Sequence, residues 1–515
     1  MNIRSRLRAG MRLNNGMNKG KHIYILLILF CSSLTGCMIS ESVHFSPSRK
    51  FASVAVISDM DVAESILKQY HPSLYWYTDS LSLRKSFQEG RQRVKDSMTE
   101  PAVRNLLNEI LSTVRCGHTS VQHSKLYSRY ISWKAPSGFP FICKITDDTT
   151  LILTSGFSRT DSLLKRGMKI VSVNERNSSQ IIDSLFPLIP VDGHSKNFSY
   201  QIISNNFSRF YNSRFPKDSV YNIIYRDSAG NLLTVTRPFY NRYADTSLSG
   251  ISLKKVKKIV PSNTILKKET VRSFWVDSAR RYAILKLNTF SSGLKYNYIR
   301  KQFKLLHKQN IPALIIDVRN NGGGIINRSL YLARMIHDQP FMYVDSVETN
   351  FKKIKRIPSS SGRLKKRIWI NLAMFFLNKK NKQDHYSFRL FAGKRYKPHR
   401  YHFKGRVIFL TGGSSFSATS MLLSSLKGLP NVQLVGEETG GGAYGNNGVF
   451  IPDLILPNTK LRMRLPLYRI INDHTLKNNG RGVMPDVEVK ATEESIRMNK
   501  DVKMIKAESM ILERR

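Results

Sequence analysis

Apolar residues recur at helical spacing between residues 103 and 114, directly after the polar start Thr99-Glu100-Pro101. The apolar positions are Val103, Leu106, Ile110 and Val114. This period, preceded by a capping residue and a first-turn proline, predicts an amphipathic helix. We expect Gly117 to end the helix in the left-handed conformation, which leaves His118 just beyond the C-terminus. There the backbone carbonyls favour the charged form of the imidazole.

Between residues 131 and 250 the pattern changes to short alternating or apolar runs. The runs at 141–145, 151–154 and 170–173 predict strands, and hence a β-rich domain. The stretch from Leu164 to Asn174, in which Gly167 precedes a Val/Ile strand, resembles the PDZ signature. That resemblance implies a peptide bound as an extra strand at a sheet edge. A spacer domain without a ligand is the alternative.

From about residue 265 to 495, apolar strand-like runs alternate with helical stretches. The runs are Ala283–Leu287, Ala313–Val318, Val407–Leu410 and Val432–Val435. Strands joined by helical crossovers predict a layered α/β core with a parallel sheet. A basic insertion at 352–406, apolar in its middle, interrupts this core. It could contact anionic lipid, cover the active site or simply pack as a solvated segment.

Length and composition indicate how many domains to expect, but they do not identify a binding partner. A chain of 515 residues exceeds what one hydrophobic core normally supports, so two or three domains are expected. The 82 Lys and Arg against 36 Asp and Glu give a net charge of +46. Such a charge can indicate nucleic-acid binding, but no nucleic-acid motif accompanies it. We interpret the charge as a property of the whole surface and expect no nucleic-acid partner.

The N-terminus has the pattern of an export signal. Lysines and arginines without acidic partners precede the apolar run Ile23–Cys31, and Leu34-Thr35-Gly36-Cys37 resembles a bacterial lipobox. We therefore expect a signal peptide at 1–36, a lipid on Cys37 and a location in the cell envelope, at the outer membrane or its periplasmic face.

The remaining domain boundaries follow from these patterns. We expect a lipidated tether at 37–58, an N-terminal helical domain at 59–130 and a C-terminal tail at 496–515, around the β-rich domain at 131–250 and the core at 265–495. Two further cysteines, Cys116 and Cys143, remain in the mature chain. An exported location permits a disulfide between them, and the sequence leaves that pairing open.

Two glycine-rich loops follow strands of the predicted core, at Asp317–Gly324 and Gly412–Thr419. Such loops can cradle phosphate, but neither has the Walker or dinucleotide spacing. In the second loop Ser417 stands at a strand-to-helix turn and is followed by Ala418. A serine placed in this way is either a helix N-cap or a nucleophile whose neighbouring amide stabilises an oxyanion.

Five motifs occur in one order along the chain. They are Gly117-His-Thr119, Leu314-Ile-Ile-Asp-Val-Arg-Asn-Asn-Gly-Gly-Gly324, Ser415-Phe-Ser-Ala-Thr419, Val435-Gly-Glu-Glu-Thr-Gly-Gly441 and Gly482-Val-Met-Pro-Asp486. This order resembles that of the C-terminal processing and tricorn-core serine peptidases, serine peptidase family 41. The resemblance implies a crotonase-like core, Ser417 as nucleophile, and an oxyanion hole made by the amides of Ala418 and of Gly322 or Gly323. It implies no cofactor and no metal.

One departure from the family pattern decides the expected base. Where the Ser-Lys members carry their lysine, this chain has Gly440-Gly-Gly-Ala-Tyr-Gly445. The resemblance then points to the tricorn-like branch, with His118 as general base. The candidates for the group that orients His118 are Asp473, Asn478, Asn479 and Glu437. We thus expect a serine endopeptidase acting on exported or periplasmic polypeptides through an acyl-enzyme. A catalytically silent, peptide-binding lipoprotein is the alternative.

Overall fold

The computed structural model describes residues 45–133, 139–146, 148–156, 161, 163–215, 218–239, 271–354, 364–381, 385–388 and 392–513. The predicted signal peptide and Cys37 lie outside these residues. The chain divides into a unit at Met1–Arg49 and a unit at Lys50–Arg515, and the description below concerns the second. Within the described residues no helix is both long and apolar enough to cross a membrane.

A six-stranded sheet forms the centre of the core, in the order β10-β11-β12-β18-β19-β24. Its strands are Arg272–Val276, Ala283–Leu287, Ala313–Asp317, Arg406–Thr411, Val432–Gly436 and Val487–Glu488. Only β10 is antiparallel to its neighbour, while β11 to β24 run parallel. Successive side chains of β12 alternate between faces, so Leu314 joins the main core whereas Ile315 joins a smaller cluster on the other face.

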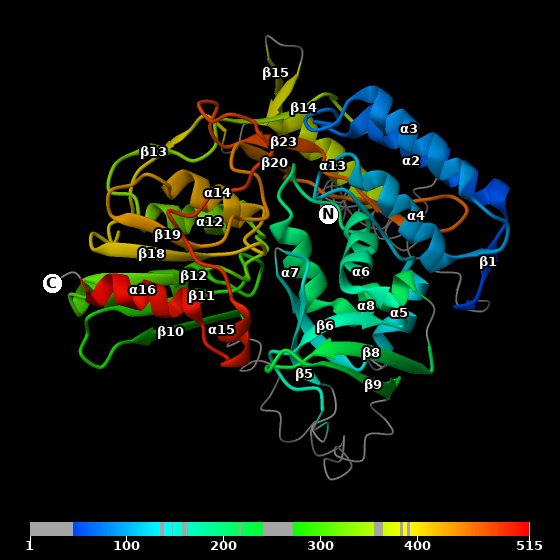
Figure 1. Cartoon of the computed structure of the whole chain (residues 1–515). Helices are drawn as coiled ribbons and strands as arrows, with labels where there is room; N and C mark the ends of the chain where they lie inside the picture. The colour runs from blue at the N-terminus through cyan, green and yellow to red at the C-terminus, as the bar shows by residue number, and fades with distance from the viewer. Residues whose placement is uncertain are drawn as a thin grey trace, which may run out of the picture. The chain divides into compact units, whose positions relative to one another are not determined.

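Helices cover both faces of this sheet (Figure 1). The main-core face packs against α11 (Tyr296–Lys308), α12 (Ile326–Arg334) and α14 (Ala418–Leu426). The other face packs against α16 (Val502–Leu512), whose Ala507 is fully buried. The fold class, α/β with a β-rich domain, is therefore confirmed.

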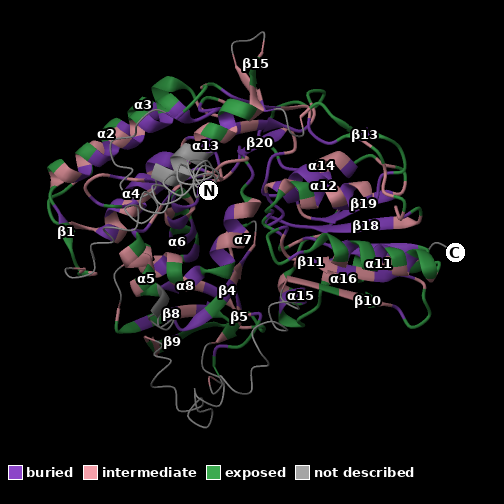
Figure 2. Ribbon diagram, turned by 180° about the vertical axis from the view of Figure 1, so that it is seen from behind, coloured by how far each residue is buried: buried purple, intermediate pink, exposed green. Residues whose placement is uncertain are grey.

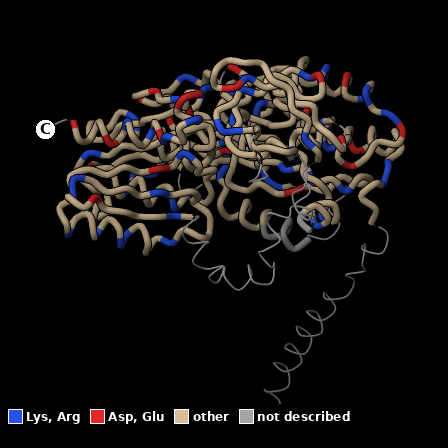
Figure 3. The backbone as a smooth tube through the Cα atoms, turned by 60° about the horizontal axis from the view of Figure 1, so that its bottom comes forward, with Lys and Arg blue, Asp and Glu red and all other residues tan. Residues whose placement is uncertain are grey.

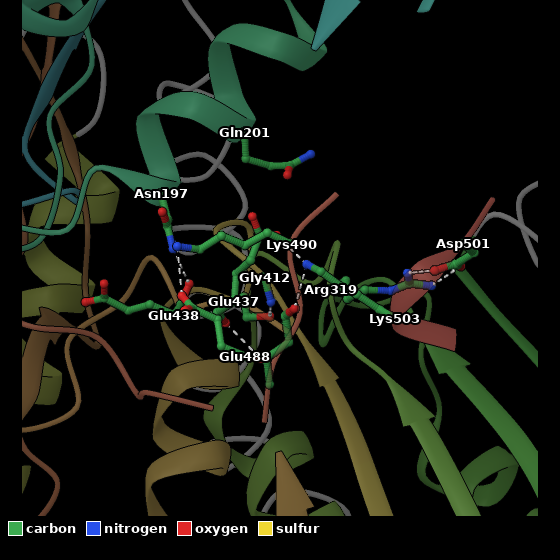
Figure 4. Close-up of polar contacts among 12 residues, drawn as sticks. Asn197, Gln201, Arg319, Gly412, Glu437, Glu438, Glu488, Lys490, Asp501 and Lys503 are labelled. Carbon is green, nitrogen blue, oxygen red and sulfur yellow. Dashed lines mark hydrogen bonds and ion pairs between the residues drawn. The ribbon is translucent and has the colours of Figure 1, made fainter. Parts of the chain in front are cut away.

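The C-terminal segment is part of the core and not the tail predicted at 496–515. Besides α16 it contains α15 (Glu493–Arg497). Arg319 donates to Asp501 at 2.6 Å, and Lys503 forms an ion pair with Glu437 (Figure 4). Because Lys503 also donates to the carbonyl of Thr411 at 3.0 Å, α16 is held directly beneath the second glycine-rich loop.

The N-terminal helices pack on the main core, with their buried residues turned inward (Figure 2). They are α2 (Ser53–Tyr70), α3 (Ser80–Gln92) and α4 (Glu100–Ser112), and β1 (Lys50–Phe51) pairs with β2 (Met98–Thr99). Two expectations need correction. The helix α2 begins inside the predicted tether. The helix α4 ends at Ser112, and the left-handed residue after it is Arg115 (φ 52°) rather than Gly117.

The β-rich domain has its own core, separate from the main one. Its sheet runs β4-β5-β6-β8-β9, with β7 beside β6. The strands of this sheet are β4 (Phe141–Ile145), β5 (Leu151–Gly156), β6 (Lys169–Val173), β7 (Arg176–Asn177), β8 (Val220–Arg226) and β9 (Leu232–Pro238). The helices in this part of the chain are α5 (Lys125–Trp133), α6 (Ser178–Leu185), η1 (Phe186–Leu188), α7 (Asn197–Asn205) and α8 (Phe207–Arg214). Cys143 is buried in this core and Cys116 in the main one, and both thiols are free.

The described part of the basic insertion is built into the fold. Its helix α13 (Leu364–Leu377) buries Ile370 and Met374 in the main core. Two strands of the insertion, β15 (Asn378–Lys380) and β16 (Tyr386–Phe388), belong to a five-stranded sheet in the order β15-β16-β14-β23-β20. The other three strands are β14 (Ser346–Thr349), β23 (Tyr468–Ile471) and β20 (Gly445–Gly448). A separate pair joins β13 (Phe341–Met342) to β17 (Arg395–Tyr396). Lysines and arginines also occur on many other elements (Figure 3), as expected for a charge spread over the surface.

Candidate active site

The two glycine-rich loops meet because they leave the C-terminal ends of neighbouring parallel strands, β12 and β18. Asn321 joins them. Its carbonyl accepts from the amide of Phe416 at 3.1 Å, and its side chain donates to the carbonyl of Leu287 at 3.1 Å. Ser415 adds a bond from its hydroxyl to the carbonyl of Val318 at 2.8 Å. The first loop is thereby fixed against the turn that carries Ser417.

Ser417 stands at that turn in an unusual backbone conformation. Its φ of 56° and ψ of −122° precede the first residue of α14, and its side chain makes no capping hydrogen bond. A non-glycine residue in such a region costs on the order of 1–3 kcal/mol and needs support from its surroundings. Ser417 thus occupies the N-cap position of α14, but its hydroxyl does not serve as a cap. Its Oγ lies 3.1 Å from Nε2 of His118.

Non-local pairing places His118 beside Ser417. The strand β3 (Ser120–Gln122) starts two residues later and pairs with β22 (Arg462–Arg464), which in turn pairs with β21 (Asp453–Ile455). On its other side Val121 exchanges two hydrogen bonds, of 2.8 and 2.9 Å, with the side chain of Asn108 on α4. The imidazole packs on the ring of Phe416, with 4.9 Å between ring centres.

The imidazole of His118 is held neutral. Burial, followed by the nearby charge of Arg464, lowers the pKa of His118 to about 4. This corrects the expectation of a charge-favouring helix end, because α4 already ends at Ser112. Nδ1 of His118 is buried and has no hydrogen-bond partner among the described residues.

The four candidates for orienting His118 are engaged elsewhere. Oδ1 of Asn478 accepts from the hydroxyl of Tyr77 at 2.8 Å. The other three also bind different groups: Asn479 accepts from the amide of Arg481 at 3.0 Å, Asp473 from the amide of Thr475 at 2.8 Å, and Glu437 pairs with Lys503. Among the described contacts none of them reaches the imidazole.

A carboxyl that the sequence did not single out lies next to the His118 segment. Oδ1 of Asp192 accepts from the amide of Gly117 at 2.7 Å, while Oδ2 is buried without a partner among the described residues. Burial raises the pKa of Asp192 to about 7. No motif marks this residue, since Pro190-Val-Asp-Gly193 reads as an ordinary turn.

The backbone amides near Ser417 differ in whether they already donate a hydrogen bond within the protein. The amide of Gly323 is already bound to Oδ1 of Asn321 at 3.0 Å. In the described part of the chain neither the amide of Gly322 nor that of Ala418 has such a partner, and Ala418 is the first residue of α14. Geometry therefore leaves Ala418 and Gly322 as the donors that can face an oxyanion.

Two hollows flank the Ser417 and His118 pair. One, of about 470 Å³, is lined by His118, Gly322 and Phe416 among others. The second, of about 280 Å³, is lined by Ser417, Gly324 and Met421, and Ile451 borders both. The described residues contain no cluster of His, Cys, Asp and Glu that could hold a metal ion.

The geometry places a serine in an unusual backbone conformation beside a histidine on an α/β core, and comparison with known proteins bears on the class of that core. Residues 281–489 match the profile of peptidase family S41. This segment of the chain is therefore similar to the peptidases of family S41.

Solved structures with a similar fold include mature CPAF complexed with lactacystin, with a TM-score of 0.63 and 14% identity over 90% of this chain and 99% of that one. A crystal structure of a CPAF mutant gives a TM-score of 0.64 and 12% identity over 88% and 96% of the two chains. At such identities the likeness concerns the fold alone. A search of curated proteins finds no match.

Proposed function

We propose that the protein is a serine endopeptidase that cleaves exported polypeptides through an acyl-enzyme on Ser417, with His118 as general base. The observation that carries this proposal is the 3.1 Å distance between Oγ of Ser417 and Nε2 of His118. A neutral imidazole at that distance can accept the hydroxyl proton at neutral pH.

The proposed reaction has two halves. Oγ of Ser417 attacks the peptide carbonyl carbon while His118 takes its proton, and the amides of Ala418 and Gly322 bind the oxyanion. The C–N bond breaks as His118 protonates the leaving amine, which leaves an ester on Ser417. A water molecule deprotonated by His118 then attacks the ester, and the acid product leaves with Ser417 regenerated.

Labelling with a fluorophosphonate probe tests the nucleophile. We expect the wild-type protein to react at Ser417 and the Ser417→Ala variant not to react. The matched control is Ser425→Ala on the same helix, because the hydroxyl of Ser425 only donates to the carbonyl of Leu422 at 2.8 Å. Labelling of Ser417→Ala at the wild-type rate would remove Ser417 from the mechanism. A wild-type protein that binds peptides but neither labels nor cleaves would support the catalytically silent alternative.

At one edge of its sheet, the β-rich domain has contacts that favour a spacer domain without a ligand over a domain that binds a peptide as an extra strand. The amide of Ile145 on β4 donates to Oγ of Ser204 at 2.8 Å, and that of Phe139 donates to Oγ of Ser208 at 3.1 Å. Because the two serines belong to α7 and α8, these helices take amides that an added peptide strand would need.

We also propose that the protein is a lipoprotein of the cell envelope, anchored through Cys37. The support is the lipobox-like sequence Leu34-Thr35-Gly36-Cys37. Fractionation of cells tests it: Cys37→Ala should leave the membrane fraction, whereas Cys31→Ala, in the segment removed on export, should remain there. Retention of Cys37→Ala would point to a different anchor.

A further inference from the structure

The 470 Å³ cavity beside His118 contains an unusual set of charges. Besides His118 and Gly322 it is lined by Arg104 on α4, Arg209 on α8 and Arg464 on β22. Among the described residues that line it, none is acidic. Arg464 is bound to Asp453 at 3.1 Å, but in the described part of the chain no carboxylate pairs with Arg104 or Arg209.

Arg104 and Arg209 come from two helices, α4 and α8, that pack against each other. Five residues further along both helices, Glu109 of α4 forms an ion pair of 2.7 Å with Arg214 of α8. Arg104 of α4 and Arg209 of α8 both line the cavity beside His118, where they are two like charges.

Arg104 is poorly satisfied where it lies. Its Nε is buried without a hydrogen-bond partner among the described residues, and Nη1 has only a 3.3 Å contact to Oδ1 of Asn105. Burial, followed by the charge of Arg209, lowers the pKa of Arg104 to about 10.

The one acid that acts on Arg104, Glu100, is engaged elsewhere. Its carboxylate accepts from the amide and hydroxyl of Ser124, at 2.8 Å each, and lies 3.1 Å from Nδ1 of His123. A partly buried guanidinium without a counter-ion is unfavourable, and an anion in the cavity relieves this cost.

We propose that Arg104 and Arg209 form a subsite for a carboxylate of the bound polypeptide, either an acidic side chain or the C-terminal carboxylate. This inference rests on the proposed function and names its substrate class. Guanidinium groups bind carboxylates through paired, charge-assisted hydrogen bonds. The apolar wall of the cavity, which includes Ile189, Phe198 and Phe210, accommodates the methylene groups that precede such a carboxylate.

The test uses peptides that differ only by Glu or Gln at successive positions, each prepared with a free and an amidated C-terminus. We expect kcat/KM to favour one carboxylate by at least about tenfold over its neutral counterpart. A preference that follows the Glu position identifies a side-chain subsite, and one lost on amidation identifies a terminal carboxylate. Arg209→Gln should reduce the preference to near unity, and Arg209→Glu should invert it in favour of Lys.

Arg214→Gln is the matched control, since it removes an arginine from the same helix outside the cavity and should retain the preference. Equal cleavage of Glu and Gln peptides by the wild-type protein would overturn the subsite while leaving the proposed function intact. If no peptide is cleaved, the proposed function fails. In that case the subsite is tested by the affinities of the same peptides for the Ser417→Ala protein. Equal affinities for the charged and neutral peptides would overturn the subsite.

Discussion

The amide of Gly117 donates a 2.7 Å hydrogen bond to Oδ1 of Asp192, which ties the β-rich domain to the residue directly before His118. A Cβ on residue 117 would lie 2.6 Å from the ring of Phe416, so any larger residue there would have to displace that ring. The position of the proposed base thus depends on a buried carboxyl from a distant part of the chain.

Removing the Asp192 side chain should weaken catalysis without removing any group from the reaction. We expect Asp192→Ala to lower kcat roughly 10- to 100-fold, because a displacement of the His118 segment by about 1 Å has effects of that size. Asp192→Asn keeps an oxygen that can accept from Gly117 and should retain most of the rate. Peptide turnover and KM measured for both variants check this. An Ala variant as active as wild type would show that β3 alone positions the imidazole.

The pH dependence of stability should reveal the buried carboxyl of Asp192. Its pKa is raised to about 7 by burial, so between about pH 4 and 7 the folded protein holds a proton that the unfolded chain has lost. This contribution is fully present at low pH and is lost as the pH rises toward 7, at roughly 1.4 kcal/mol per unit at most.

Chemical denaturation of wild type and Asp192→Asn, from pH 4 to 8, measures it. The wild-type free energy of unfolding should fall relative to that of the variant as the pH rises. Parallel curves would mean that Asp192 ionises normally in the folded state. Other groups, including His71 with a pKa lowered to about 3 by burial, are present in both proteins and cancel in the difference.

The sequence predicted local features well because the physics that sets them is local. The runs at 283–287, 313–318, 407–410 and 432–435 coincide with β11, β12, β18 and β19, since buried parallel strands need continuous apolar stretches. The motifs also singled out Ser417 and His118, which the structure brings within hydrogen-bonding distance.

Features that depend on distant parts of the chain were not predictable in this way. The pairing of β3 with β22 joins residues about 340 positions apart, and Asp192 lies in a turn of ordinary composition. The end of α4 was placed too late because Val114 continues the apolar period beyond the last helical turn. The predicted tail was wrong for a related reason: α16 packs on a sheet face formed by distant parts of the chain.

The rate of peptide hydrolysis should be nearly independent of pH around neutrality. With the pKa of His118 lowered to about 4, first by burial and then by Arg464, the ring is already neutral at physiological pH. The acid limb of the kcat/KM profile should therefore fall well below the usual histidine range of about 6.5. His118→Ala should lose several orders of magnitude in kcat with little change in binding. An acid limb near the usual histidine value would contradict the lowered pKa of His118.

The turn that carries Ser417 should tolerate no side chain on Gly323. A Cβ there would lie 2.7 Å from the carbonyl oxygen of Phe416, 2.8 Å from Cβ of Ser417 and 2.9 Å from the amide nitrogen of Ala418. Real Cβ atoms do not approach so closely, and since two of these three atoms are backbone, the loops must separate. Gly323→Ala should therefore displace the nucleophile and a proposed oxyanion donor together.

Gly230 supplies a matched control because its φ of 91° equals that of Gly323, while a Cβ on Gly230 would meet nothing within 4 Å. Both Ala variants incur the strain of a positive φ, about 1 kcal/mol, but only Gly323→Ala adds the steric conflict, for which overpacking costs about 1–3 kcal/mol more. Thermal unfolding should show a modest loss for Gly230→Ala and a larger one for Gly323→Ala, and fluorophosphonate labelling should fall only in the latter. Equal stability losses together with unchanged labelling would contradict this prediction. They would mean that the two loops can separate without moving Ser417, so that the contact between Gly323 and the turn does not hold the strained conformation.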